Sequence, residues 1–491
     1  MSRTYWIAAA LALTGVGACS MDSGGEAKSI PLATSISQQD KEEGAKAHPD
    51  LLAEFGGAYK GPQADYVERV GRRIAVQSSL SNAQNDFTIT LLNSSVNNAF
   101  AIPGGYVYIT RQLMALCNDE AEMAGVLGHE VGHVAAMHSQ RRQKAASRNA
   151  IGGALLQILT GAVLGDSALG GLLQKGIGTG SQLLTLKFSR GQEYEADDLG
   201  IRYLGKAGYD PTALSNMLAS LAAQSALDAR ASGQSSSVPE WASTHPDPAS
   251  RVTRALSEAR QSGATGTIRN RNAFLNALDG ITYGDDPKQG IIRGSSFIHP
   301  ELHLSFTAPD GYTMMNGAQA VTITGSGGQA QFSGGAYSGD LDKYLASVFQ
   351  SLSQNSNLSS DAIKRTTING IPAAYASMRA NSKSGQVDAT VIAYEMSGTS
   401  AYHFVMLTPV GRGFGPFASM AQSFRRISAK EAGDVKPRKV DVVTVKPGDT
   451  IASLSSRMAY DDYKQERFLT LNALTASSTL KAGDRVKIVT Y

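Results

Sequence analysis

The sequence has little cysteine and little net charge. Its 491 residues include two cysteines, Cys19 and Cys117, which are too few for a disulfide framework. The 45 basic and 42 acidic side chains leave a formal net charge of +3, which gives no electrostatic basis for nucleic-acid binding. Hydrophobic residues make up 42% of the chain. A chain of this length and composition can bury cores without disulfides, and we expect roughly two to four domains.

Long hydrophobic runs are also absent. The apolar run at residues 5–16 is shorter than the ~20 residues that a membrane-spanning helix needs. Arg3 precedes this run, and the small residues Gly17 and Ala18 follow it. Residues 1–18 are therefore predicted to be a secretory signal.

Cys19 adds a second feature to this signal. Residues 16–19, Val-Gly-Ala-Cys, resemble the lipobox of bacterial lipoproteins; the alternative is a plain signal with an incidental cysteine. The resemblance implies a lipid on Cys19, which would anchor the protein to a membrane because each buried methylene contributes about 0.8 kcal/mol. With Cys19 lipidated, Cys117 has no partner for a disulfide. Ser20, rather than Asp, follows the cysteine, which resembles outer-membrane sorting in the periplasm of a Gram-negative bacterium.

Changes of residue pattern divide the rest of the chain. A helix-rich segment gives way to Gly, Asn and Asp, and then to short alternating runs separated by Gly and Ser turns. Those runs predict strands of an antiparallel sheet, so the fold class is multidomain α+β. In chain order we expect a tether at 19–36, a mainly helical domain with a small sheet at 37–262, a linker at 263–290, an antiparallel α+β domain of unknown role at 291–428, a second linker at 429–440 and a small module at 441–491.

Residues 151–183 are rich in Gly, Leu and Ala. The apolar part before Asp166 is shorter than a spanning helix requires, which favours a pair of buried or loosely packed helices. The alternative is a mobile lid, or a surface that dips into the bilayer.

Residues 129–133, His-Glu-Val-Gly-His, carry the strongest chemical motif. Asn118 is a suitable N-cap for a helix over this region, and acidic residues follow where the positive end of a helix favours them. On this helix a separation of four residues puts His129 and His133 on one face, where both rings can reach one metal ion. Glu130 projects beside them and can hold a water on the metal. The alternative is a surface helix with two solvated histidines, but the chain has only eight histidines.

A catalytic zinc ion needs three protein ligands and an open position. Residues 192–198, Gln-Glu-Tyr-Glu-Ala-Asp-Asp, offer the best third ligand. Glu193 and Asp197 are four residues apart and share one helix face. Glu193 can ligate the metal, while Asp197 accepts the remaining N–H of a ligand histidine and orients its ring. Glu195 and Asp198 are expected to point elsewhere and to be solvated.

Together these motifs resemble the M48 family of zinc metallopeptidases, of the gluzincin type. Three further stretches are similar to the family: residues 98–111 before the active-site helix, His138 after the second ligand, and Thr-His-Pro at 244–246 with Arg251 beyond. The exported members that assist outer-membrane quality control are the most similar in character.

The resemblance implies one Zn²⁺ per chain and an endopeptidase reaction. The metal activates a water, and Glu130 acts as the general base. His245 and Arg251 are implied to lie over the open side of the metal, where Arg251 could stabilise the oxyanion. His245 could do the same, or it could occupy the fourth metal position and keep the enzyme latent. His138 is expected to be structural, because its offset from His133 turns it away from the ligand face.

Residues 100–109 alternate apolar and small side chains around a Pro-Gly-Gly turn. As an edge strand, with Asn98, Ala99, Phe100 and Ala101 as contacting residues, this region could bind substrate backbone by adding a strand to the sheet. That mode tolerates many side chains and suits unfolded proteins. As an ordinary strand it would only support the helix, and both possibilities stay open.

The C-terminal segment contains Val-Lys-Pro-Gly-Asp-Thr-Ile at 445–451, Leu-Asn-Ala-Leu at 471–474 and Leu-Lys-Ala-Gly-Asp-Arg-Val-Lys-Ile at 480–488. This order resembles a LysM module, a small β-α-α-β unit. The resemblance implies affinity for glycan that contains N-acetylglucosamine, and hence for peptidoglycan. A degenerate module used only for packing is the alternative.

The combined features predict a lipid-anchored zinc endopeptidase of the periplasm, on the outer membrane, that degrades unfolded or misfolded envelope proteins and can dock on peptidoglycan. The second hypothesis is a non-proteolytic chaperone or scaffold in outer-membrane protein assembly, with a plugged site. His299, His303 and His403 have no acidic or cysteine neighbours at ligand spacing. They are expected to be surface or core histidines, and their domain to contact substrate or partner proteins.

Overall fold

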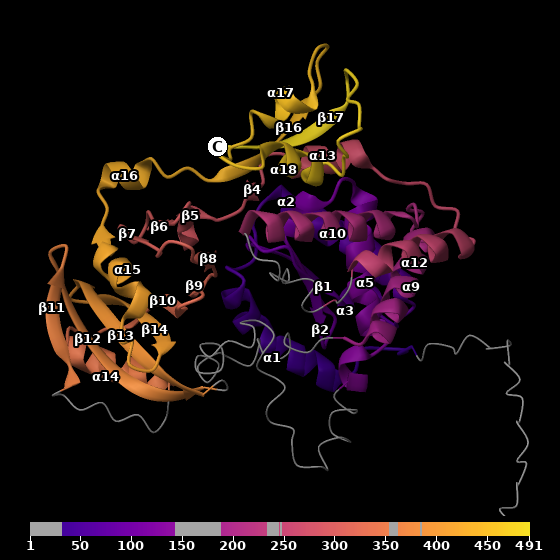
Figure 1. Ribbon diagram of the computed structural model, residues 1–491. Helices are drawn as coiled ribbons and strands as arrows, with labels where there is room; N and C mark the ends of the chain where they lie inside the picture. Colours follow the sequence, from indigo (N-terminus) through magenta and orange to yellow (C-terminus); the bar gives the residue numbers. More distant parts are fainter. Residues whose placement is uncertain (1–31, 143–187, 233–244, 246–247, 353–361, 383–384) are drawn as a thin grey trace, which may run out of the picture. The chain divides into compact units, whose positions relative to one another are not determined.

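The computed structural model describes residues 32–142, 188–232, 245, 248–352, 362–382 and 385–491 (Figure 1). The signal at 1–18, the residue Cys19, most of the tether and the Gly-rich segment 151–183 lie outside the described residues. Within the described ranges, no helix combines the length and the apolar character needed to cross a membrane.

A small sheet with helices beside it begins the first domain. The elements are α1 (Gln38–Glu54), α2 (Pro62–Ala75), the 3-10 turn Val76–Ser78, α3 (Ala83–Asp86), β1 (Thr88–Leu92), β2 (Ala99–Ile102) and β3 (Tyr106–Thr110). The strand order is β1-β3-β2, with β1 parallel and β2 antiparallel to β3. Among the described residues β2 is therefore an edge strand. Gly104 and Gly105 form the β2–β3 turn with φ of 88° and 81°, a left-handed backbone that favours glycine.

The remaining helices of this domain are α4 (Arg111–Leu116), α5 (Glu120–Ala135), α9 (Arg190–Lys206), α10 (Ala213–Ser232) and α12 (Pro248–Gln261). Helices α2, α9 and α10 pack against α5. Helix α5 is buried along almost its whole length, and the Asp119 side chain caps it by accepting from the Glu122 N–H. The N-cap is thus Asp119 and not Asn118, which the sequence suggested one residue too early.

Helices α5 and α9 pack backbone against backbone where glycines meet. A Cβ on Gly200 of α9 would lie 3.0 Å from the backbone nitrogen of His129. A Cβ on Gly132 of α5 would lie 3.1 Å from the carbonyl oxygen of Ala196. Larger residues at these positions would push the helices apart, because both contacts are with backbone atoms. The glycines therefore set the distance between the two motifs that carry the ionisable residues.

The second domain is built on an antiparallel sheet of order β11-β12-β13-β14-β10-β9-β8. Helix α14 (Leu341–Leu352) covers one face through buried residues such as Leu345 and Phe349. An apolar cluster that includes Phe306 and Phe404 fills the other face, toward the sheet β15-β7-β6-β5. This arrangement confirms the predicted antiparallel α+β domain. The strands and short helices are β5 (Ile291–Arg293), β6 (Ser296–His299), β7 (Leu304–Thr307), β8 (Thr313–Asn316), β9 (Val321–Gly325), β10 (Gly328–Ala336), β11 (Lys364–Ile368), β12 (Ile371–Ser382), β13 (Gly385–Ser397), β14 (Ser400–Pro409), the 3-10 turn Gly415–Phe417, α15 (Ala418–Ser423), β15 (Arg425–Arg426) and α16 (Ala429–Gly433).

The C-terminal module has the predicted β-α-α-β order. Its elements are β16 (Arg438–Thr444), α17 (Ile451–Ser455), α18 (Lys464–Leu471) and β17 (Arg485–Thr490). A third strand, β4 (Thr282–Tyr283), pairs with β16 from outside the module. The stretch expected as a linker at 263–290 thus contains β4, α13 (Arg271–Leu278) and the 3-10 turn Pro287–Gln289.

Lys487 of β17 joins this module to the helical domain. Its Nζ donates to the carbonyl oxygens of Ala115 at 2.8 Å, Leu116 at 3.3 Å and Cys117 at 2.6 Å, where α4 ends. The Lys487 side chain is fully buried, and burial lowers its pKa to about 7. The last carbonyls of a helix lack donors within the helix and favour a cation. Lys487 therefore caps α4 from another domain.

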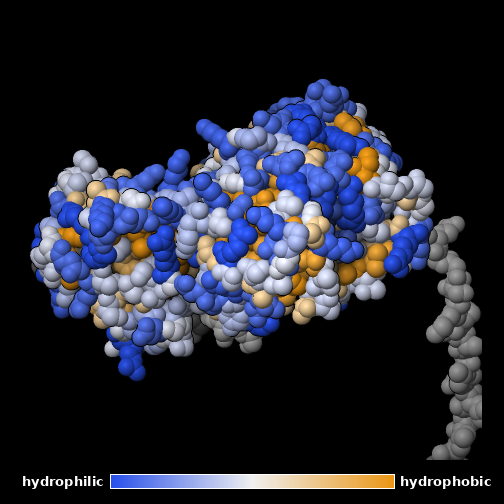
Figure 2. All heavy atoms as spheres, turned by 90° about the horizontal axis from the view of Figure 1, so that it is seen from above, coloured by the Kyte–Doolittle hydropathy of each residue, from blue (hydrophilic) through white to orange (hydrophobic). Residues whose placement is uncertain are grey.

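Polar residues cover most of the face shown in Figure 2, with smaller apolar patches between them. The large apolar side chains exposed among the described residues are Leu32, Val76, Leu302, Met315, Val410, Tyr463 and Tyr491. They come from separate segments of the chain, and scattered exposure of this kind is ordinary for a folded protein.

Candidate metal centre

Four side chains bring potential metal donors together: His129 and His133 of α5, Glu193 of α9, and His245. One donor atom of each lies within 4.8 Å of all the others. His129 Nε2 lies 3.0 Å from His133 Nε2 and 3.3 Å from His245 Nδ1. Glu193 Oε1 lies 3.6 Å from His133 Nε2 and 3.1 Å from His245 Nδ1.

These separations suit a tetrahedral metal ion. With metal–ligand bonds of about 2.0–2.1 Å, the corners of a tetrahedron lie about 3.3 Å apart. The separations given above between the four donors scatter around that value, and all four side chains are buried. Imidazole nitrogens with one carboxylate also form a donor set that zinc prefers. The residues present therefore fit a four-coordinate metal ion.

Asp197 lies beside the first histidine of this group. Its Oδ1 is 2.9 Å from His129 Nδ1, a contact that leaves Nε2 free for a metal and orients the ring. Arg251 donates to both oxygens of Asp197, from Nε at 2.9 Å and from Nη2 at 2.6 Å. Burial alone would raise the pKa of Asp197, but the Arg251 guanidinium outweighs burial and holds that pKa well below its usual value.

Arg251 pairs with two buried carboxylates of the site, Asp197 and Glu193. Its side chain is buried, and its Nη1 also donates to Glu193 Oε2 at 2.5 Å. The two carboxylates of Asp197 and Glu193 hold the guanidinium in place, because buried negative charges need a paired cation. The oxyanion-stabilising role that the family resemblance implies for Arg251 stays a prediction. Arg251 also helps to hold the pKa of Glu193 below its usual value, against the effect of burial.

Glu130 is fully buried next to the donor group. Within the described residues neither of its carboxylate oxygens has a hydrogen-bond partner. Burial raises the pKa of Glu130, which makes the carboxylate a better proton acceptor at neutral pH. A buried carboxylate with spare acceptor capacity beside a metal-binding group is suited to hold a water.

His245 stands between two carboxylates. Its Nδ1 faces Glu193 at 3.1 Å, and its Nε2 lies 3.6 Å from Glu130 Oε1. Burial would lower the pKa of His245, but Glu193 and Glu130 outweigh burial and raise it. The structure thus places His245 as the fourth member of the donor group.

His138 and Glu195 also contact the site. Met137 has a φ of 52°, so the chain turns back just after α5 ends. His138 Nδ1 then lies 2.8 Å from His133 Nδ1, and its Nε2 lies 3.0 Å from Glu195 Oε2. The expectation that His138 turns away was wrong because it assumed an uninterrupted helix. Glu195 is not simply solvated, because it also pairs with Arg141. No motif in the sequence marks the left-handed residue that brings them together.

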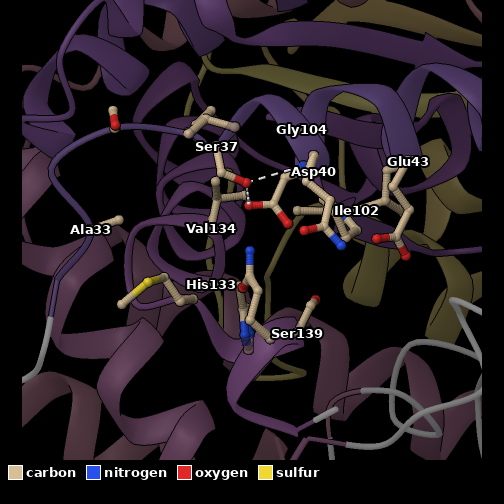
Figure 3. A pocket seen from close by; sticks show the side chains of 16 residues that line it. Ala33, Ser37, Asp40, Glu43, Ile102, Gly104, His133, Val134 and Ser139 are labelled. Carbon is tan, nitrogen blue, oxygen red and sulfur yellow. Dashed lines mark hydrogen bonds between the residues drawn. The ribbon is translucent and has the colours of Figure 1, made fainter. Parts of the chain in front are cut away.

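A cavity of about 310 Å³ opens beside His133 (Figure 3). It is lined by the end of α5, by residues 33–43 and by the chain from Ala101 through the β2–β3 turn. Asp40 and Glu43 face it in Figure 3. The cavity therefore connects the predicted substrate-binding strand with a member of the donor group.

The four residues predicted to contact substrate are placed differently from one another. Ala101 lines the cavity. Asn98, Ala99 and Phe100 are buried, and the Phe100 ring packs against Phe55. The side chains of these three support the strand from within, so substrate could meet them only through their backbone.

Comparisons with known proteins identify two regions. The profile of Peptidase family M48 matches residues 62–259, and that of the LysM domain matches residues 443–489. The beta-barrel assembly-enhancing protease of Yersinia pestis is 33% identical over 202 residues, which are 40% of this chain and 39% of that protein. The mitochondrial metalloendopeptidase OMA1 of Schizosaccharomyces pombe is 30% identical over 210 residues, 42% of this chain and 57% of that protein. Metalloprotease YcaL of Escherichia coli K12 is 33% identical over 169 residues, 32% of this chain and 61% of that protein. The chain spans about two fifths of the length of the assembly-enhancing protease that it matches.

Proposed function

Because residues 62–259 form a peptidase family M48 domain with a complete His/His/Glu/His metal-binding group, we propose that the chain is a zinc-dependent endopeptidase of unfolded or misfolded cell-envelope proteins. One observation carries this proposal. The buried carboxylate of Glu130 lies beside the donors of His129, His133 and Glu193, with both oxygens free of hydrogen bonds to described residues.

Each residue of the site has a proposed task. Zn²⁺, when bound, polarises a peptide carbonyl and makes a water more acidic. Glu130 takes the proton of the attacking water and passes it to the leaving amine, a double role that its raised pKa favours. Asp197 keeps the proton of His129 on Nδ1, and Arg251 keeps Asp197 ionised. Through these pairs Arg251 is proposed to act as a positioning residue.

Strand β2 is proposed to bind substrate. In the described part of the chain it pairs only with β3, and the cavity beside His133 follows its end. A peptide segment added to this edge would be held by backbone hydrogen bonds, whatever its side chains. Such binding suits unfolded segments, because folded proteins keep most of their backbone groups paired.

His245 is proposed to close the site in the resting enzyme. A catalytic zinc site needs an open position, and His245 Nδ1 lies within the donor group. Substrate binding would then have to displace this ring. If so, His245→Ala should raise the basal rate of casein cleavage. An unchanged or lower rate would instead assign His245 a direct catalytic role.

The location proposed is the periplasm of a Gram-negative bacterium, with a lipid anchor on the outer membrane. The signal and Cys19 support the anchor, and the LysM domain supports attachment to peptidoglycan. The names of the assembly-enhancing relatives support an envelope role. Cys19→Ala should release the protein from the membrane fraction, and protein that still sediments with membranes would contradict the lipid anchor.

A non-proteolytic chaperone or scaffold is the second candidate. One observation favours it: the whole donor group is buried, with His245 in the fourth place. A permanently closed site of this kind would bind a metal without cleaving substrate.

The test compares the zinc-loaded wild type with Glu130→Gln on casein, an unstructured protein. We expect the wild type to cleave, to stop after chelation and to recover with zinc. Glu130→Gln should keep its zinc and cleave at least ~100-fold more slowly. Glu301→Gln, at an exposed position of the second domain, is the matched control and should cleave like the wild type.

Equal cleavage by the wild type and Glu130→Gln would overturn the proposed mechanism. If no zinc-loaded form cleaves, His245→Ala included, the scaffold hypothesis is favoured.

A further inference from the structure

The two ligand histidines of α5 are oriented in different ways. His129 meets a carboxylate directly, because its Nδ1 lies 2.9 Å from Asp197 Oδ1. Among the described residues, no carboxylate contacts the Nδ1 of His133; that atom lies 2.8 Å from His138 Nδ1. A carboxylate contacts His138 in turn: His138 Nε2 lies 3.0 Å from Glu195 Oε2. His138 therefore stands between His133 and the carboxylate.

This geometry allows one assignment of protons when His133 binds a metal through Nε2. The single proton of neutral His133 must then lie on Nδ1, from which it is donated to His138 Nδ1. His138 accepts there, so its own proton lies on Nε2 and is donated to Glu195. Every ring nitrogen in the chain of contacts has one partner of the correct kind.

We propose that His138 is a positioning residue for His133, and that it transmits the orienting effect of the Glu195 carboxylate to this metal ligand. The inference rests on the proposed zinc site, but it assigns a role to residues outside the donor group. Partners of this kind hold the tautomer and direction of a ligand ring. The metal would thus be held by one ligand with a direct carboxylate partner and one with a relayed partner.

The surroundings hold this relay in place. Arg141 pairs with Glu195 at 2.5 Å, which keeps the carboxylate ionised and directed at His138. Gln192 Nε2 donates to the His138 carbonyl oxygen at 3.3 Å. His138 itself is fully buried, so water does not compete for its ring nitrogens.

The ring of His133 is restrained from its face as well. Phe188 stacks on it, with ring centroids 3.9 Å apart. Stacking restrains the plane of the ring but not which nitrogen carries the proton. That choice depends on the partner of Nδ1, which is His138.

The test measures zinc affinity by competition with a chromogenic chelator, whether or not the chain cleaves protein. His138→Phe keeps a ring but removes the acceptor, and we expect zinc to bind about 10- to 100-fold more weakly. His138→Asn places an amide oxygen near the position of Nδ1 and should recover most of that loss. Glu195→Gln keeps an acceptor without its charge and should cause a smaller loss, of a few fold.

His403→Phe, at a buried histidine of the second domain, is the matched control and should bind zinc like the wild type. Circular dichroism of the metal-free proteins shows whether each variant is folded; if His138→Phe is not, the comparison of His138→Asn with Glu195→Gln decides. A second readout is the long-range ¹⁵N–¹H spectrum of the histidine rings in zinc-loaded wild type, which should show His133 with its proton on Nδ1.

The proposal is overturned if folded His138→Phe binds zinc as tightly as the wild type, or if His138→Asn weakens binding as much as His138→Phe. It is also overturned if Glu195→Gln leaves affinity unchanged while His138→Asn weakens it strongly. A wild type that binds no zinc would instead contradict the proposed function itself.

Discussion

Buried histidines occur in both larger domains, and they differ in what they face. In the helical domain, His129 and His133 lie against each other and against carboxylates. In the sheet domain, His403 lies 3.2 Å from the Ser333 hydroxyl and 2.9 Å from the Tyr344 hydroxyl. Burial lowers the pKa of His133 well below its usual value and that of His403 to about 4.

Burial and a lowered pKa therefore do not by themselves mark a functional site. His403 satisfies its two ring nitrogens with neutral hydroxyls and packs under α14, which is what a core histidine needs. The histidines of α5 keep one ring nitrogen for an orienting partner and point the other at a common centre. Convergence of donors, and not burial, separates the two cases.

The strongest test of this comparison removes one histidine from each domain. His133→Ala deletes a donor, and we expect zinc affinity to fall by more than about 100-fold, beyond the loss from an outer partner. His403→Ala removes an equally buried ring and should leave zinc affinity unchanged. Chelator competition on both purified variants checks this, and similar zinc affinities in the two would contradict the assignment.

A second test removes an orienting carboxylate. Asp197→Asn should lower zinc affinity about 10- to 100-fold, because the amide pairs poorly with Arg251 and holds His129 less firmly. Asp198→Asn is the control on the same helix, since Asp198 pairs with Arg254 and is not a member of the donor group. The same titration is used, and equal effects from the two substitutions would show that Asp197 acts only through general charge.

A third test concerns Lys487, a buried charge outside the donor group. Lys487→Met leaves three carbonyl oxygens of α4 without their donor, and we expect the free energy of unfolding to fall by about 2 to 4 kcal/mol. Lys481→Met, at an exposed lysine of the same module, is the control. Urea unfolding measures both. Unchanged stability in Lys487→Met would mean that the contact between the two domains contributes little.

The smallest expected effect concerns pH and His403. Its folded pKa is lowered to about 4 from 6.5, so between these values the unfolded chain binds a proton that the folded chain does not. The stability contributed by a neutral His403 is therefore present above about pH 6.5 and is lost as pH falls toward 4, by about 1 to 3 kcal/mol. His403→Phe should lack this part of the decline. Urea unfolding at pH 4.5 and 7 compares the two, and parallel losses would contradict the shift.

The sequence predicted the pairs of site residues that are separated by about one helical turn. His129 with His133, and Glu193 with Asp197, are each four residues apart, and a helix puts such pairs on one face. It also predicted the sheet domain and the C-terminal module, because alternation and turn residues mark strands and their ends.

Other parts depend on contacts between distant residues. The left-handed backbone of Met137 turns the chain so that His138 contacts His133. Methionine at that position does not indicate a left-handed backbone. Arg251 pairs with two carboxylates of another helix, and no spacing in the sequence indicates that pairing. Lys487 carries no motif, and its three acceptors lie some 370 positions earlier in the chain.

Zinc K-edge X-ray absorption on the zinc-loaded chain tests the central claim most directly, because it counts and identifies the ligands. The structure predicts four nitrogen or oxygen ligands, with scattering from three imidazole rings in the wild type and from two in His245→Ala. A spectrum with a sulfur ligand, or with fewer than three imidazole rings in the wild type, would contradict the proposed metal centre.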